Sequence, residues 1–295
     1  MFVSFRTFSQ YLRCFGLIVV AGVVLLSCAP AGNKPAVQTS PYERSKDAFK
    51  SGDFDKALDL TDKLAVASPP ADCTDRARVL RAVIYTGKLK SASELAEAYS
   101  KGADTAKSPR FKSEYLRLHH DNLMAAATAA LGLAETAHQI APDGVMAKQV
   151  VLEASYPITE GPVEVSELAR VEQGGWIESD QQDNAAADAL RKGMDNALAE
   201  AVAGDRAKAR LALANGSTQL DSTAFAIFLT KQLADGATVF DRHHGRDPQK
   251  LLTLCDQGEL SLKAALALLK DTPNKDEQKE ALKLQDRFKT LRKDK

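Results

Sequence analysis

The chain has 295 residues, with 39 Lys or Arg and 39 Asp or Glu, so its formal net charge at pH 7 is zero. A neutral chain without a long basic run gives no reason to expect a nucleic-acid partner. Its first segment is typical of a secretory signal peptide, because Arg6 and Arg13 precede an apolar run from Phe15 to Leu26. This run is too short to span a membrane, since a spanning helix needs about 20 apolar residues.

The apolar run ends in the letters LLSC, in which the cysteine is Cys28. This ending resembles the lipobox of bacterial lipoproteins, whose cysteine is lipidated and becomes the mature N-terminus. The resemblance implies that residues 1–27 are a signal peptide and that a lipid on Cys28 attaches the mature chain to a membrane. Ala29 stands where an aspartate would resemble an inner-membrane signal, so the expected location is the periplasmic face of the outer membrane. The alternative is an ordinary signal peptide with an incidental cysteine.

Residues 28–40 follow as a short segment rich in Pro, Gly and Ala. Such a composition offers little apolar surface to bury, so it does not repay the entropy of ordering the chain. We therefore expect a flexible tether between the lipid and the folded domain.

Residues 41–156 begin with a pattern that predicts a helix–turn–helix corner. In KSGDFDKAL, Lys50 to Leu58, a glycine permits a tight turn and an aromatic residue can fill it. Here Gly52 makes the turn, Phe54 fills it, and Ala57 is small enough to lie where two helices cross.

Two later stretches repeat this corner. Residues 87–99 place Gly87, Leu89 and Ala92 in the same register, and a vaguer third copy follows. The small residues of its second helix and its closing proline are Ala130, Ala134, Ala137 and Pro142. Helix hairpins with a period of about 34 residues resemble the tetratricopeptide family. The resemblance implies an all-α fold of stacked antiparallel helix hairpins, wound into a right-handed solenoid.

The Ala-rich residues 183–295 continue the helical spacing of apolar residues, and no useful length of β alternation is present. Gly204 and Gly258 each precede an apolar-periodic stretch, so we expect them to separate helices. The second half is thus predicted to be helical and tetratricopeptide-like.

Residues 157–182 interrupt the pattern and are expected to form an irregular loop. The segment is rich in Pro and Gly and contains Trp176, the only tryptophan of the chain. A long irregular connection is either packed on the domain or used for binding. Trp176 is therefore either a packed side chain or a contact for a partner.

No pattern in the chain predicts catalysis or a cofactor. The pairs His119-His120 and His243-His244 are adjacent in sequence, and neighbours on a helix point about 100° apart, so one pair cannot chelate one ion. We expect no metal, no cofactor and no enzymatic activity. Cys73 and Cys255 can pair in an oxidising periplasm or remain two buried thiols.

Binding residues follow from the family resemblance, in which the first helix of each hairpin lines a concave groove. Transferred to this chain, the groove positions are Tyr42, Lys46, Phe49, Lys50, Arg81, Ile84, Tyr85, Lys112, Tyr115, His119 and Asn122. The set contains cationic and aromatic residues and no acid, which suits an acidic peptide segment. The alternative is that these residues are the solvated outer face of the helices.

The sequence therefore predicts a lipid-anchored, helical-repeat adaptor that binds another envelope protein at the periplasmic face of a membrane. The alternative is a carrier of a small hydrophobic ligand, or an accessory subunit of a periplasmic transport system. A carrier needs an apolar channel, for which the stretch from Thr223 to Leu233 supplies candidate lining residues.

Overall fold

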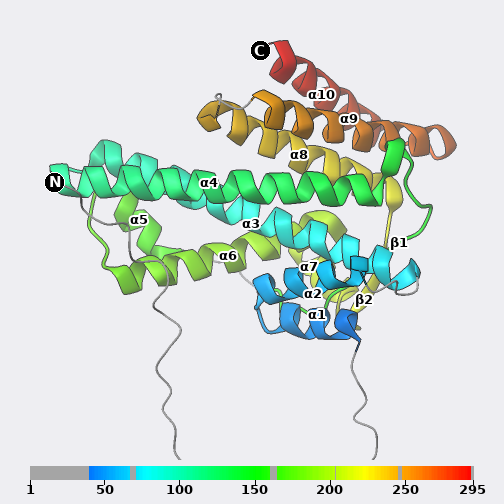
Figure 1. Cartoon of the computed structure of the whole chain (residues 1–295), viewed down its shortest axis with the longest axis horizontal. Coiled ribbons are helices and arrows are strands. Elements are labelled where there is room, and N and C mark those ends of the chain that lie inside the picture. Colours follow the sequence, from blue (N-terminus) through cyan, green and yellow to red (C-terminus); the bar gives the residue numbers. More distant parts are fainter. Residues whose placement is uncertain (1–39, 67–70, 160–164, 203, 245–247, 294–295) are drawn as a thin grey trace, which may run out of the picture. The chain divides into compact units, whose positions relative to one another are not determined.

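The computed structural model describes residues 40–66, 71–159, 165–202, 204–244 and 248–293 (Figure 1). The predicted signal peptide, the lipidation site Cys28 and all of the tether but Ser40 lie outside the described residues, as does Pro69. All the elements below belong to one compact unit, residues 39–295. No helix of the described part is both long enough and apolar enough to cross a membrane.

The described residues are almost entirely helical, which confirms the all-α prediction. In chain order the elements are α1 (Pro41–Lys50), α2 (Phe54–Val66), α3 (Ala71–Thr105), α4 (Pro109–Ile140), the 3-10 turn η1 (Pro142–Gly144), β1 (Val150–Glu153), α5 (Ser166–Glu172), α6 (Ser179–Val202), α7 (Arg206–Ala212), β2 (Ser217–Leu220), α8 (Ser222–His244), α9 (Pro248–Asp271) and α10 (Lys275–Lys293).

The first predicted corner is present. Gly52 has a φ of 82°, a left-handed conformation that glycine adopts without strain, and it lies between the end of α1 and the start of α2. The ring of Phe54 packs against Phe49 with centroids 5.5 Å apart, and Ala57 is fully buried. Residues 41–66 are thus a helix hairpin closed by the turn that the sequence predicted.

The second and third predicted corners are wrong, because α3 and α4 are each one uninterrupted helix. Gly87 lies inside α3, where a Cβ would be 2.7 Å from Cε of Met194 on α6. On the facing helix a Cβ at Gly193 would lie 2.4 Å from the carbonyl oxygen of Gly87. The glycine therefore permits two helix backbones to approach closely, and it does not end a helix.

The two glycines of the second half behave differently from each other. Gly204 has a φ of 70° and follows the end of α6, as predicted. Gly258 lies inside α9, where a Cβ would be 2.1 Å from the ring of Phe288 on α10, so the turn predicted there is wrong. Gly258 instead marks the crossing of α9 and α10.

The long helices α3 and α4 pack along each other at the centre of the unit (Figure 1). Helix α6 covers α3 on one side, while α8 and α9 cover α4 on the other, and α10 packs on α8 and α9. Because α3 is contacted by α2, α4, α5, α6 and β1, its buried residues lie all around it. This explains why its sequence shows only a weak apolar stripe.

A short antiparallel ribbon was not predicted. β1 pairs with β2, with Val150 opposite Leu220 and Glu153 opposite Ser217. Each strand has only four residues, too few for alternation to stand out in a sequence. The ribbon ties the connection after α4 to the connection before α8.

The segment 157–182 is not wholly irregular, because it contains the helix α5. Trp176 stacks on Phe111 with ring centroids 4.9 Å apart and on Tyr115 at 5.8 Å. The tryptophan therefore packs this segment onto the first turns of α4, in agreement with the packed-loop alternative.

Candidate functional site

The groove residues transferred from the family resemblance do not form one exposed surface. Five of the eleven are buried in the core, namely Tyr42, Phe49, Arg81, Ile84 and Tyr115. Their predicted exposure is wrong, because α1 packs on α2, and α3 and α4 pack on each other and on further helices, and these five side chains lie within those contacts. Tyr85 is half-buried, and its ring lies where a Cβ at Gly132 would be, 2.4 Å from Cε1.

The charge of Arg81, one of the predicted groove residues, is already compensated by an acidic residue of the protein. Its side chain is 7% exposed and pairs with Asp62 of α2 at 2.7 Å. Its guanidinium also lies over the ring of Tyr85, 5.9 Å from the centroid. Arg81 therefore connects helices inside the protein and is not placed to bind an external carboxylate.

The remaining predicted groove residues are spread over the unit. Lys50 is exposed at the end of α1, whereas Lys112 is exposed near the start of a different helix, α4. His119 places Nδ1 at 2.8 Å from the carbonyl oxygen of Ala96, and Asn122 donates to the carbonyl oxygen of Leu118 at 2.8 Å. The structure therefore does not bring these residues together.

Lys46 belongs to a local cluster around Glu153. Its Nζ lies 3.0 Å from a carboxylate oxygen of Glu153 and 3.0 Å from one of Glu43, and Arg76 also pairs with Glu153. Burial raises the pKa of Glu153, but the hydrogen bonds from Lys46 and Arg76 and the charge of Lys46 outweigh it and hold the pKa below its usual value. Glu153 therefore links β1 to α1 and α3 as an ionised carboxylate.

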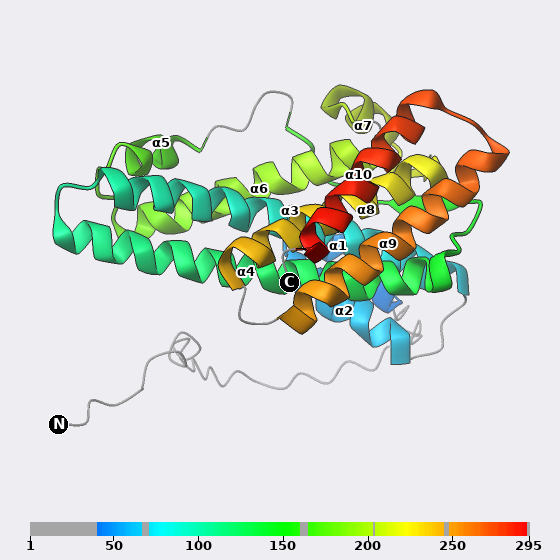
Figure 2. The same cartoon turned by 90° about the horizontal axis from the view of Figure 1, so that it is seen from above.

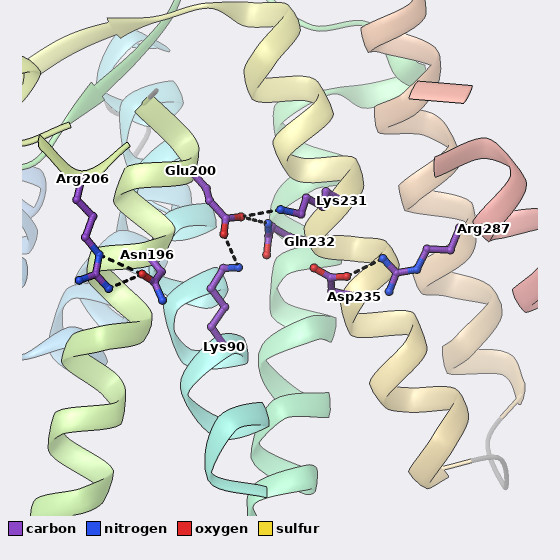
Figure 3. Close-up of polar contacts among 8 residues, drawn as sticks. All are labelled: Lys90, Asn196, Glu200, Arg206, Lys231, Gln232, Asp235 and Arg287. Atoms are coloured by element: carbon purple, nitrogen blue, oxygen red, sulfur yellow. Dashed lines mark hydrogen bonds and ion pairs between the residues drawn. The ribbon is translucent and has the colours of Figure 1, made fainter. Parts of the chain in front are cut away.

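A polar cleft of about 480 Å³ lies among α3, α6, α8 and α10. Beside it Glu200 of α6 accepts hydrogen bonds from Lys90 of α3 at 2.9 Å and from Gln232 of α8 at 2.8 Å (Figure 3). Lys231 lies 3.4 Å from the same carboxylate. Burial raises the pKa of Glu200, and the two lysines more than offset this, so the pKa is lowered overall.

The other charges of this cleft are also paired. Arg287 of α10 donates to Asp235 of α8 at 2.6 Å (Figure 3). It also donates to the hydroxyl of Thr238 at 2.7 Å. Lys192 of α6 pairs with Glu94 of α3 at 2.6 Å. These ion pairs and hydrogen bonds connect α3, α6, α8 and α10. We therefore interpret the cleft as a place where polar side chains hold these helices together, and not as a site for a charged ligand.

An apolar groove of about 1030 Å³ lies between α9 and α10. We call it the α9–α10 groove. Leu262 and Leu269 form its buried floor, Leu266 is half-buried, and Leu282 of α10 is 58% exposed at its lip. An exposed large apolar side chain beside a concave apolar surface is the arrangement that marks an interaction site.

One residue of the α10 sequence, Leu282, indicates this groove, although the helical spacing of apolar residues does not predict it. The buried stripe of α10 is Ala281, Leu284, Phe288 and Leu291, at helical spacing. Leu282 lies off this stripe, next to Ala281, so it cannot face the same core. An apolar residue that lies outside the buried stripe of an otherwise charged helix indicates that this second face of the helix also contacts another surface.

Neither cysteine forms a disulfide. Cys73 of α3 is half-buried and Cys255 of α9 is buried, and both are free thiols. Burial raises the pKa of Cys255 to about 11, which makes its thiol unreactive. Among the described residues no group of three or more His, Cys, Asp or Glu side chains is placed to hold a metal ion.

Comparison with known proteins yields no relative for this chain: no protein-family model, curated protein or solved structure matches it.

Proposed function

We propose that this chain is a lipid-anchored protein of the bacterial cell envelope that binds another envelope protein, and that the α9–α10 groove is its binding surface. The observation that supports this surface is its lining: a large open depression with leucines on its floor and an exposed leucine at its lip. Aliphatic grooves of this kind accept protein side chains. The proposal involves no catalytic step and no cofactor.

The membrane attachment rests on the lipobox-like ending at Cys28. A lipid there, followed by the tether 28–40, would hold the helical unit at the periplasmic face of the outer membrane. We restrict the resemblance to the tetratricopeptide family to the hairpin α1–α2, which keeps the predicted turn.

The structure does not favour the carrier alternative. The stretch from Thr223 to Leu233, a candidate channel lining, lies in α8, where Phe225, Leu229 and Leu233 are fully buried in the main core. Side chains that fill a core cannot line a channel at the same time.

The attachment is tested by replacing Cys28 with serine and fractionating cells. We expect the wild-type chain in the membrane fraction and the Cys28→Ser chain, once exported, in the soluble periplasmic fraction, because the lipid is the proposed anchor. If the exported variant stayed with the membranes after a high-salt wash, the lipid would not be the anchor.

The binding surface is tested by photocrosslinking in cells. A photoreactive amino acid replaces Gln285, which lines the groove, or Lys283, which is exposed on α10 but does not line it. We expect a discrete crosslinked adduct from position 285 and none from position 283. Equal adducts from both positions, or no adduct from position 285, would contradict the assignment of the groove.

A further inference from the structure

The geometry of the groove suits a helix better than an extended peptide. The loop between Asp271 and Lys275 joins α9 to α10 (Figure 2), and Gly258 of α9 meets Phe288 of α10 near the far end of the pair. The α9 wall carries Leu262, Leu266 and Leu269, which are spaced four and three residues apart and so lie along one face of that helix. A third helix laid against such a row can insert its own apolar residues at the same spacing.

The walls of the groove are helices, so they offer no continuous row of free backbone donors or acceptors; only the last turn of α9, at Leu269 and Lys270, has carbonyl groups without helical partners. Helix backbones bond internally, and only sheet edges present a row of unpaired groups to an extended strand. An occupant that must satisfy its own backbone in an apolar groove is therefore a helix.

The rim of the groove carries uncompensated positive charge. Lys263 donates to the carbonyl oxygen of Asp143 at 3.0 Å, a neutral partner that leaves the ammonium charge uncancelled. Lys270 is exposed and has no ion-pair partner among the described residues. Lys289 also lines the groove and pairs with Asp286 at 3.0 Å, on an exposed part of α10.

The acidic residue of the rim does not cancel these lysines. Glu259 is bound by Arg292, with its carboxylate 2.9 Å from Nε. Arg292 also pairs with Asp256. Arg292 therefore shares one positive charge between two carboxylates. The lining itself has three lysines and one carboxylate, a formal charge of +2 (three minus one), so it favours an acidic occupant.

This charge argues against a second copy of the chain as the occupant. A twofold symmetric contact puts the same patch on both partners, so Lys263 and Lys270 of one copy would face the same lysines of the other. Like charges brought together across an interface oppose association. The complementary occupant carries acidic residues beside its apolar stripe.

We propose that the α9–α10 groove binds an amphipathic helix of the envelope partner whose apolar face is flanked by Glu or Asp. This inference rests on the proposed function, because it specifies the partner's chemistry at the same surface. The leucines of the groove receive the apolar face of the helix. Lys263 and Lys270 pair with its acidic flanks and set its orientation.

The test uses two synthetic probe peptides and the full chain purified in a neutral detergent. Each peptide has about 14 residues, or four helical turns, with leucines at helical spacing. One has glutamates and the other has lysines beside the leucines. Binding of each fluorescent peptide is measured by anisotropy at low and high salt.

We expect the glutamate peptide to bind the wild-type chain at least about tenfold more tightly than the lysine peptide, with affinity falling as salt rises. The double variant Lys263→Glu/Lys270→Glu should reverse this order. The matched control Lys279→Glu/Lys283→Glu makes the same change of net charge on exposed residues outside the groove, and should keep the wild-type order. Leu282→Glu should weaken binding of the glutamate peptide most.

The proposal is overturned if neither peptide binds, if both bind equally, or if the control variant also reverses the order. It is also overturned if Leu282→Glu converts a wild-type dimer to a monomer in light scattering, because the occupant would then be a second copy. Leu282-dependent binding of the Cys28→Ser chain to phosphatidylglycerol vesicles, without peptide binding, would make the groove a lipid contact. Failure with peptides while crosslinks from position 285 persist would reject only the helix chemistry, and would leave the proposed function standing.

Discussion

Asp195 is a buried acidic residue of α6 whose loss of hydration is only partly compensated. Its side chain is fully buried, one carboxylate oxygen accepts the backbone N–H of Thr159 at 3.2 Å, and the other has no hydrogen-bond partner. Burial raises the pKa of Asp195, and the hydrogen bonds of Thr159 and the charges of Arg206 and Arg191 offset only part of this. The ionised form is therefore destabilising, because an unpaired buried charge loses its hydration.

We predict that Asp195→Asn stabilises the protein at neutral pH. The folded protein holds the Asp195 proton more tightly than the unfolded chain, so this group's contribution to stability is present below the unfolded pKa of about 3.9 and is lost as pH rises. The amide keeps an acceptor for Thr159 and carries no charge. The free energy of unfolding from urea titrations should be about 1–2 kcal/mol higher for the variant at pH 7.

The pH dependence separates this mechanism from a change in packing. Near pH 3 both forms are uncharged, so the advantage of Asp195→Asn should disappear there. As a control, Asp188→Asn changes an acid on the same helix whose side chain is 36% exposed and paired with Arg191. An advantage that is the same at pH 3 and pH 7 would show that ionisation is not its cause.

At the scale of elements, helical periodicity predicted which segments are helices but not where they end. Gly87 and Gly258 show why. A glycine can adopt the left-handed conformation of a turn, or it can make room for a second helix at a helix crossing. The sequence alone does not distinguish these two roles. Gly52 and Gly204 take the first role, with φ of 82° and 70°, whereas Gly87 and Gly258 take the second. The choice depends on a facing helix that is distant in sequence, namely α6 for Gly87 and α10 for Gly258.

We predict that Gly258→Ala destabilises the protein although alanine favours a helix. A Cβ there would lie 2.1 Å from Phe288, so the α9–α10 crossing must open. Overpacking of this kind destabilises a protein by about 1–3 kcal/mol. Replacing glycine by alanine inside a helix stabilises it by about 1 kcal/mol, so we expect a net loss of up to about 2 kcal/mol. Thermal and urea unfolding measure the net change.

A double-mutant cycle identifies the clash as the cause. Phe288→Leu removes the ring, so Gly258→Ala should cost less in that background than in the wild type, and the two changes should not be additive. Additive effects would mean that the alanine acts through something other than Phe288. Because α10 is one wall of the α9–α10 groove, we also expect Gly258→Ala to weaken binding there.

At the scale of the whole molecule, the sequence predicted the fold class but not the candidate site. The groove residues carried over from the family resemblance depended on three hairpins, and only the hairpin α1–α2 is present. Because α3 and α4 are continuous helices, Ile84 and Tyr115 belong to the core, and Phe49 of α1 is buried as well. The α9–α10 groove is lined by residues of two helices that pack together, and local sequence patterns do not specify how helices pack. In the sequence, the groove was indicated by Leu282, an apolar residue outside the buried stripe of α10.

Ion pairs between elements distribute stability across the molecule. Glu153 joins β1 to α1 and α3, and Glu200 joins α6 to α3 and α8. The pKa of each is lowered, because their cationic partners outweigh the effect of burial. The folded state therefore binds these two protons more weakly than the unfolded chain, and each carboxylate stabilises the fold only while it is ionised.

We predict that the protein loses stability in acid through these two carboxylates. Their contribution is fully present above the unfolded glutamate pKa of about 4.3 and is lost as pH falls through the lower folded pKa. At pH 7, Glu200→Gln should lower the free energy of unfolding by about 1–2 kcal/mol, since it leaves Lys90 and Lys231 without their counter-charge. Near pH 2 the variant and the wild type should be equally stable, because the carboxylate is then protonated in both states. Glu280→Gln serves as the control and should change little at either pH, because Glu280 pairs with the exposed Lys283 of its own helix. A loss in Glu200→Gln that persisted undiminished at pH 2 would assign the role of Glu200 to packing and not to its charge.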